Sequence, residues 1–131
     1  MSHLLDVSFL LACGWDSHPR HKACRAWLER QPEFYTCPIT ELGFIRVSMT
    51  PAFRTAFDDA KAALENITNR KGARFLPEDL DTRGLSGLVS HGEVTDGYLV
   101  ALSKKNGLKL ATLDESLCRK AWAKGLAENP V

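Results

Sequence analysis

Short apolar runs alternate along this chain with longer stretches in which apolar residues recur every three or four positions. A run of about four to eight apolar residues is typical of a buried strand, whereas the wider spacing is typical of a helix with one face in the core. Prolines mark the boundaries, because Pro32 ends one helix and Pro38 suits the first turn of the next. In the first half the pattern predicts a strand at residues 3–7, a turn or helix at 8–15, a helix at 17–30, a strand at 33–37 and a helix at 39–49.

The second half continues this alternation around one irregular stretch, residues 77–94. Thr55 and Asp58 have the spacing of a capping box, which predicts a helix that turns Phe57 inward and has Gly72 after its end. The irregular stretch is expected to hold only a short helix near residues 85–90. The other predicted elements are a strand at 73–76, a helix at 96–106 capped by Thr95, a strand at 108–112, a helix at 115–124 capped by Asp114 and ended by Gly125, and a tail at 126–131 that is either an edge strand or irregular.

Strands that alternate with helices of about three turns favour one class of fold. They predict βαβ units, and therefore an α/β protein with a parallel sheet covered by helices on both faces. In such sheets ligands collect beyond the carboxyl ends of the strands. Polar residues that directly follow a predicted strand are therefore the first candidates for a functional site.

The composition is ordinary for a globular domain, with 44% hydrophobic and 25% charged residues. At 131 residues, with no repeat or linker, we expect a single domain spanning residues 1–131. The formal net charge of +1 excludes a strongly polybasic nucleic-acid binder. A nucleic-acid ligand would therefore be held by a local basic patch or through metal ions.

The cysteines and the first residues indicate a cytoplasmic protein. None of the four cysteines forms a C-x-x-C pair, so a zinc ribbon is not expected and the thiols are predicted to be reduced. The chain begins without a basic segment and meets a charge at Asp6, unlike a signal peptide. The apolar residues 7–13 are too few to cross a membrane, and we expect no membrane association.

Four of the sixteen acidic residues stand out by their setting. Asp6 and Asp114 follow predicted strands, while Glu41 and Asp96 lie in the first turns of predicted helices. A parallel sheet could bring all four to one edge, where they would repel one another unless a cation entered. Hard divalent cations such as Mg²⁺ take oxygen ligands, so the pattern favours metal-assisted hydrolysis of a phosphodiester.

Each of these acids also has an ordinary structural explanation. Aspartate is common at helix caps and first turns, which would account for Asp96 and Asp114. Asp6 could be a turn residue at a strand end, and Glu41 could face solvent from an apolar helix. Spacing alone therefore leaves the choice between capping and a shared site open.

The same residues carry a resemblance to a known family. The chain resembles PIN-domain ribonucleases, the toxin partners of VapBC-type toxin–antitoxin pairs. Each matching segment is weakly specific, and their order and spacing along nearly the whole chain make the likeness strong. The matching segments are residues 4–12, 21–27, 37–47, 94–102 and 107–114.

The resemblance implies both a fold and a site. The fold is a three-layer α/β/α sandwich with a central parallel sheet of four to five strands. Asp6, Glu41, Asp96 and Asp114 form the acidic quartet, with Asp6 and Asp96 as the firmest ligands for Mg²⁺ or Mn²⁺. Glu41 and Asp114 would be ligands or groups that position water. The implied activity is endoribonucleolytic cleavage of RNA.

The family likeness also implies supporting residues and partners. Such toxins often carry asparagine two residues after the first aspartate, and here Ser8 stands in its place. Thr112 is a second hydroxyl of the same kind, unless it is an ordinary β-branched strand residue. Apart from the likeness, Arg46 follows Glu41 in the same predicted helix and could pair with a carboxylate or a phosphate, or form a structural ion pair. A small VapB-like antitoxin would cover the acidic cleft, and the protein would form a homodimer.

Two other classes of function compete with the ribonuclease. A PIN-like module that binds RNA or antitoxin without turnover would keep the acidic pocket, and Ser8 is the feature that favours it. An aspartate-based phosphatase would need a second aspartate at the position of Ser8, which argues against that class. Among the remaining candidates, Glu93 lies on the approach to Asp96, and Trp15 and Trp27 are expected in the core or at a dimer interface.

Overall fold

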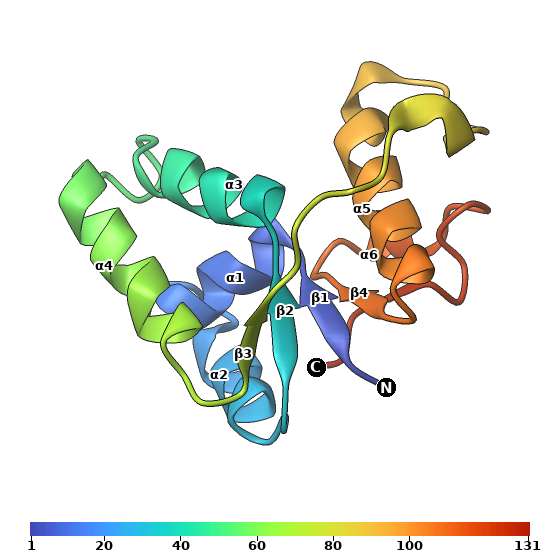
Figure 1. Cartoon of the computed structure of the whole chain (residues 1–131). Coiled ribbons are helices and arrows are strands. Elements are labelled where there is room, and N and C mark those ends of the chain that lie inside the picture. Colours follow the sequence, from blue (N-terminus) through green and yellow to red (C-terminus); the bar gives the residue numbers. More distant parts are fainter.

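The computed structural model describes all residues from 1 to 131, and a parallel sheet of five strands lies at its centre (Figure 1). The strand order is β3-β2-β1-β4-β5, and every neighbouring pair is parallel. The tail adds the edge strand β5. The strands are β1 (His3–Leu5), β2 (Phe34–Thr36), β3 (Ala73–Phe75), β4 (Lys109–Ala111) and β5 (Ala127–Glu128).

Helices cover both faces of this sheet (Figure 1). α1 to α4 pack on one face, and α5 and α6 pack on the other. No helix is both long enough and apolar enough to span a bilayer. The helices are α1 (Val7–Gly14), α2 (His21–Glu29), α3 (Pro38–Ser48), α4 (Phe57–Thr68), α5 (Val94–Lys105) and α6 (Glu115–Cys118), with 3-10 turns at Thr82–Gly84 and His91–Glu93.

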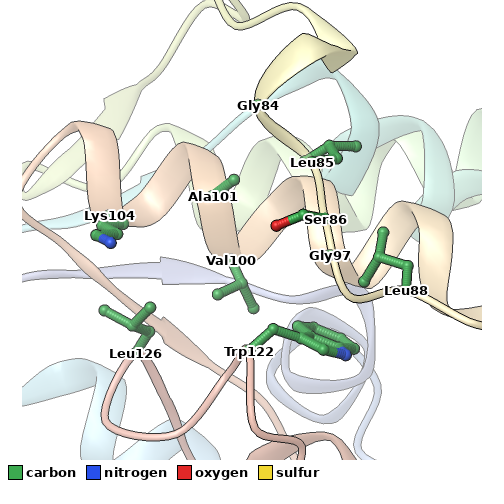
Figure 2. Close-up of a pocket in the computed structure, with 10 residues that line it drawn as sticks. All are labelled: Gly84, Leu85, Ser86, Leu88, Gly97, Val100, Ala101, Lys104, Trp122 and Leu126. Atoms are coloured by element: carbon green, nitrogen blue, oxygen red, sulfur yellow. The ribbon is translucent and has the colours of Figure 1, made fainter.

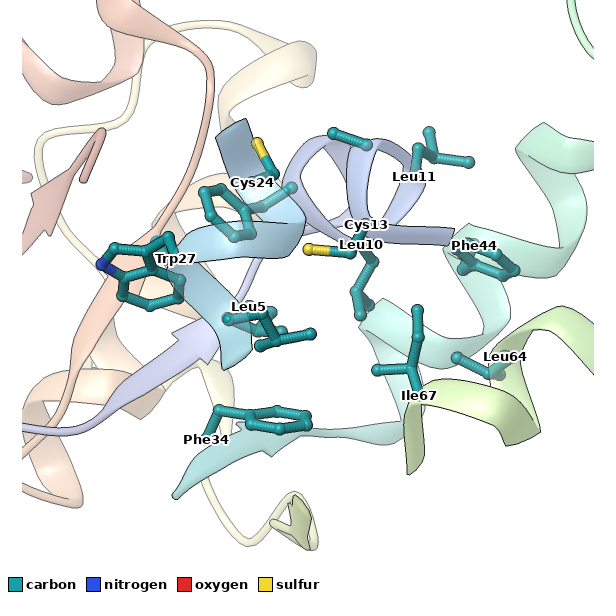
Figure 3. Packing of buried hydrophobic residues seen from close by; sticks show 14 residues of the cluster. Leu5, Leu10, Leu11, Cys13, Cys24, Trp27, Phe34, Phe44, Leu64 and Ile67 are labelled. Carbon is teal, nitrogen blue, oxygen red and sulfur yellow. The ribbon is translucent and has the colours of Figure 1, made fainter. Parts of the chain in front are cut away.

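Two hydrophobic clusters explain the three layers. Successive strand residues point to opposite faces, so Leu5 joins the cluster under α1 to α4 while Leu4 joins the cluster under α5 and α6. Figure 3 shows the first cluster, in which Phe44 and Trp27 reach inward from α3 and α2. Each fully buried side chain of this size stabilises the fold by roughly 1.5–3 kcal/mol. The predicted α/β sandwich with four to five parallel strands is confirmed.

The last helix is shorter than the predicted residues 115–124. α6 ends at Cys118, and turns continue as far as Gly125, which has a positive φ of 79°. The two residues of this stretch that reach the core are Leu117 and Ala123. A spacing of six places residues on different faces of an α-helix, so a short helix that buries Leu117, followed by turns that bury Ala123, brings both into the core where one continuous helix would not.

The start of α4 also differs from the prediction. Its N-cap is Ala56, and the Thr55 hydroxyl instead donates to the Phe53 carbonyl over 3.3 Å. The capping box is therefore wrong, because Thr55 is used by the preceding turn. Phe57 is 50% exposed rather than inward, since the buried face of α4 begins only at Ala60.

Three further boundaries are corrected. Residues 85–90 form no helix, and 3-10 turns flank them on either side. Thr95 is not a cap, because the turn His91–Glu93 runs directly into α5 at Val94. The second helix begins at His21 rather than residue 17, since His18 Nδ1 accepts the Arg20 N–H in a turn (3.0 Å).

Gly72 has a different purpose from the predicted helix cap. α4 ends at Thr68 with Asn69 as its C-cap, three residues before the glycine. A Cβ atom at position 72 would lie 2.6 Å from the Pro32 carbonyl oxygen. The glycine therefore allows two backbone segments to approach closely at the start of β2 and β3.

Candidate active site

The carboxyl ends of β1 and β4 bring Asp6 and Thr112 together. The two strands pair in register, and the Asp6 N–H donates to the Ala111 carbonyl just before Thr112 (2.9 Å). The Thr112 hydroxyl donates to Asp6 Oδ2 over 2.7 Å, and the Val7 N–H donates to Oδ1 over 2.8 Å. Asp6 is only 7% exposed. Both oxygens of a buried carboxylate are thus held in place, as predicted for the end of a strand.

Ser8 completes this network. Its hydroxyl lies 3.5 Å from Asp6 Oδ2 and 3.3 Å from Thr112 Oγ1, and it accepts the Leu113 N–H over 3.1 Å. Thr112 Oγ1 in turn accepts the Asp114 N–H (3.1 Å). Each hydroxyl has one donor proton and two acceptor sites, which these contacts use. Serine therefore links the start of α1 to the chain beyond β4.

Asp114 caps α6 and lies on the same side of the sheet. Its Oδ1 accepts the Leu117 N–H over 3.1 Å and the Ser116 hydroxyl over 2.7 Å. The Ser116 hydroxyl, together with the backbone N–H groups of the helix start, holds the pKa of Asp114 below its usual range. This carboxylate is therefore ionised across the neutral pH range. Asp114 is therefore the predicted cap of α6, and it also lies near the other acids.

Asp96 lies in the first turn of α5, and its pKa is raised whereas that of Asp114 is lowered. It is partly buried, and burial, followed by repulsion from Asp6, Asp114 and Glu93, raises its pKa to about 6. Asp6 is affected in the same sense: burial outweighs its hydrogen bonds, and Asp114 adds repulsion, so its pKa is also raised. Asp6, Asp96 and Asp114 therefore share one local field, although they are 90 and 18 residues apart in sequence.

Glu41 stands slightly apart from these three acids. It lies in the first turn of α3, and its Oε2 accepts the Thr36 hydroxyl over 2.7 Å at the end of β2. It is not among the charges that raise the pKa values of Asp6 and Asp96. Arg46 is exposed on the last turn of α3 and forms no ion pair. The structure thus places Asp6, Asp96 and Asp114 near enough for repulsion among them to contribute to the raised pKa values of Asp6 and Asp96, and leaves Glu41 beside the neighbouring strand.

An open pocket of about 220 Å³ contains further residues that the sequence did not point to. Asp96 and Asp114 line it together with Ser116, Lys120 and Trp122. The spacing of Ser116 from Asp114 is a recognisable capping signal, whereas neither Lys120 nor Trp122 belongs to any periodic pattern, because the turns after α6 place them.

Glu93, which the sequence placed near Asp96, also lines this pocket. Its Oε1 accepts the Val89 N–H (2.9 Å) and its Oε2 meets Lys120 Nζ (3.2 Å). These contacts, the backbone hydrogen bond first, lower the pKa of Glu93. Lys120 is therefore held at the pocket wall by a carboxylate that stays ionised.

Comparisons with known proteins identify the family. Residues 3–123 match the family model of the PIN domain. The chain belongs to the PIN domain family. Ribonuclease VapC39 of Mycobacterium tuberculosis is 37% identical to it over an alignment that covers 98% of this chain and 99% of the relative. Ribonuclease VapC38 of the same organism is 36% identical, and the match covers 85% and 84% of the two chains.

A solved PIN structure supports the fold. The crystal structure of Mycobacterium tuberculosis VapC20, described as a sarcin–ricin loop cleaving toxin, superposes with a TM-score of 0.65. The match covers 89% of this chain and 92% of VapC20, with 18% sequence identity. At that identity the likeness concerns the fold alone. The PIN family and the three-layer architecture predicted from the sequence are both confirmed.

The site formed by Asp6, Asp96 and Asp114 has the donor atoms that divalent cations prefer. PIN-domain ribonucleases are generally dependent on divalent metal ions, and the donors here are carboxylate oxygens, which hard cations prefer. The raised pKa values of Asp6 and Asp96 show that their negative charges lack sufficient compensation within the chain. No three His, Cys, Asp or Glu side chains stand close enough together to form a ready-made metal cage. The donor set therefore fits a cation that the carboxylates hold together with water and a substrate phosphate.

Proposed function

We propose that this PIN-domain protein is a metal-dependent endoribonuclease, the toxin of a type II toxin–antitoxin pair, that hydrolyses phosphodiester bonds of RNA. The observation that carries the proposal is the shared field of Asp6, Asp96 and Asp114 at the ends of β1 and β4. The names of the relatives VapC38 and VapC39 agree with a ribonuclease. Single-stranded or loop RNA is the expected substrate class, because unpaired bases can be splayed out and read.

Asp6 and Asp96 are the residues that we propose as ligands of Mg²⁺ or Mn²⁺. When bound, such an ion supplies an activated water and stabilises charge on the phosphate. The Thr112 and Ser8 hydroxyls hold Asp6 in one orientation. Asp114, kept ionised by Ser116, contributes negative charge and an acceptor for a proton of bound water.

Lys120 and Glu41 are proposed to act around this centre. Lys120 Nζ lies at the pocket wall beside Glu93 and can donate to a phosphate oxygen of the substrate. Glu41, anchored by Thr36, is placed to orient water from the side of β2. Arg46 is exposed on the last turn of α3, and its proposed role is a contact with RNA phosphates away from the reacting one.

The partners follow from the same family. We propose a VapB-like antitoxin that covers the acidic site, a homodimer as the working form, and a cytoplasmic location where RNA is available. We also propose that residues 1–131 act as one PIN domain. The alternative of a binding module without turnover depended on Ser8, and the Ser8 hydroxyl is part of the network that holds Asp6. That feature therefore no longer favours an inactive protein.

The proposal is tested by RNA cleavage with purified protein, free of antitoxin, in a chelator and in added Mg²⁺ or Mn²⁺. Wild type is expected to cut a mixture of cellular RNAs only with metal. Asp6→Asn and Asp96→Asn each remove a negative ligand and are expected to lower cleavage by at least about 100-fold.

Asp16→Asn is the matched control, because Asp16 is exposed on the turn after α1, away from the site. It should cut as wild type does. Undiminished cleavage by both Asp6→Asn and Asp96→Asn, or full activity of wild type in the chelator, would refute the proposed function. Thermal melting of every variant confirms that each is folded when assayed.

A further inference from the structure

We propose that a second pocket, beside the acidic site, binds an unpaired nucleobase next to the scissile phosphate, and that Trp122 is the specificity-determining residue. The inference rests on the proposed ribonuclease function and extends it to substrate recognition. Trp122 lines both the acidic pocket with Asp96 and Asp114 and a second pocket of about 200 Å³, whose lining is mixed apolar and polar. One side chain therefore forms the boundary between the acidic pocket and this second pocket.

This second pocket, called here the Trp122 pocket, is built from three parts of the chain (Figure 2). Leu85 and Leu88 come from the irregular segment before α5, Val100 from α5, and Trp122 and Leu126 from the turns after α6. In Figure 2 the Trp122 indole lies across from Leu88, and Leu126 and Lys104 stand at the opposite end. The indole is partly exposed, so part of it is available to a ligand.

Gly97 lies between this pocket and the acidic site. It directly follows Asp96 in α5, and a Cβ atom there would lie 2.7 Å from Leu88 Cδ1. The glycine thus lets Leu88 pack against the same turn of α5 that carries Asp96. A ligand in the Trp122 pocket is therefore positioned by the helix that also positions the carboxylate.

The charges around the pocket match a nucleotide better than an apolar peptide side chain. Lys104 lines one end and forms no ion pair, and Lys120 lines the acidic pocket on the other side of Trp122. A base in RNA has a phosphate on either side, so a cation near each end and an aromatic wall between them suit it. The Ser86 hydroxyl at the rim can donate to or accept from the edge of a base.

The test combines a protein change with an RNA change. The cut site is mapped for wild type, and oligonucleotides spanning it are made with a single abasic residue at each flanking position in turn. Wild type is expected to lose roughly 10- to 100-fold in kcat/KM at one abasic position, mostly through KM, because stacking is lost. Trp122→Leu should show the same loss on the intact RNA and no further loss on that abasic RNA.

Trp122→Phe is the control that distinguishes stacking on an aromatic ring from the mere presence of apolar bulk in the pocket wall. Phenylalanine keeps an aromatic face, whereas leucine keeps only apolar bulk, so Trp122→Phe should stay within about threefold of wild type. Trp122→Leu that cuts the same sites with unchanged kcat/KM and unchanged abasic sensitivity would overturn the inference. So would a Trp122→Leu protein that loses only antitoxin binding, since the pocket would then be a protein-docking surface.

A binding measurement keeps the inference testable without cleavage. Each of the four nucleoside 5′-monophosphates is titrated into wild type, Trp122→Leu and Asp96→Asn by isothermal titration calorimetry, a readout that does not depend on the indole. At least one is expected to bind wild type and Asp96→Asn, and its affinity should fall at least about tenfold in Trp122→Leu. Absence of binding by wild type would refute base binding, whereas binding without any RNA cleavage would refute only the proposed function.

Discussion

The two sides of the acidic site are built in different ways. On the sheet side, Asp6 and Asp114 accept five hydrogen bonds of 3.5 Å or less from backbone N–H groups and hydroxyls. On the helix side, Asp96 is partly buried, and no hydrogen bond offsets the burial and repulsion that raise its pKa to about 6. Hydrogen bonds therefore orient the carboxylates of the sheet side and offset part of the burial of Asp6, whereas the charge of Asp96 on the helix side has no hydrogen bond to offset its burial and is relieved by a proton or a cation.

This difference follows from the elements that carry each residue. Asp6 and Thr112 extend paired strands, so the sheet register determines where their side chains meet. Asp96 is placed by the first turn of α5, and burial and neighbouring negative charges, without a hydrogen bond, set its pKa. Such a site combines carboxylates in fixed positions with repulsion between their negative charges, and a bound cation reduces that repulsion.

The largest expected effect on stability tests the sheet side. Thr112→Val preserves shape but removes the 2.7 Å hydrogen bond to Asp6 Oδ2, and it leaves the Asp114 N–H without its acceptor. Because Asp6 is buried, the free energy of unfolding should fall by about 2–3 kcal/mol at pH 7.5. Urea denaturation of the antitoxin-free protein measures this loss.

Thr95→Val is the same substitution at an exposed position of α5. It should change the free energy of unfolding by no more than about 0.5 kcal/mol. If Thr112→Val were equally mild, the hydroxyl network would not be what holds Asp6, and the contrast between the two sides would lose its basis.

On the helix side, a substitution of Asp96 is expected to increase the free energy of unfolding, by a smaller amount. The pKa of Asp96 is raised from 3.8 to about 6 by folding, so the folded state binds its proton more tightly than the unfolded state. Stability is therefore unaffected by this group below about pH 4 and falls as the pH rises toward 6. Asp96→Asn should be more stable than wild type at pH 7.5 by on the order of 1–2 kcal/mol, a value reduced for solvent screening, and should show no gain near pH 4.

Thermal melting in a chelator, repeated with Mn²⁺, measures this gain. Manganese should raise the melting temperature of wild type and have little effect on Asp96→Asn, because the variant lacks a charged ligand. The exposed Asp16→Asn control should follow wild type under both conditions. A destabilised Asp96→Asn protein at pH 7.5 would mean that the helix side is as well compensated as the sheet side.

The same contrast explains how much of this site is visible in the sequence. Asp6 and Asp114 lie at the C-terminal ends of predicted strands, and in a parallel sheet that position assigns them to one edge. The alternation of strands and helices likewise predicts the layers. Lys120 and Trp122 escape prediction because α6 ends at Cys118 and turns place the residues that follow, and no periodic rule describes turns. The start of α4 was missed because Thr55 bonds within a turn, where its spacing to Asp58 suggested a cap.

Glu41 offers the subtlest test, because it belongs to neither side. Its Oε2 accepts the Thr36 hydroxyl, and its charge does not contribute to the raised pKa values of Asp6 and Asp96. Glu41→Gln keeps an oxygen acceptor for Thr36, so the variant should fold normally. RNA cleavage should fall by less than about tenfold, which corresponds to roughly 1.4 kcal/mol, against at least about 100-fold for Asp6→Asn. Glu65→Gln, an exposed change on α4, is the matched control and should cut as wild type does. A 100-fold loss in Glu41→Gln would place Glu41 among the ligands, and the site would then extend across β2, β1 and β4 as a single acidic centre.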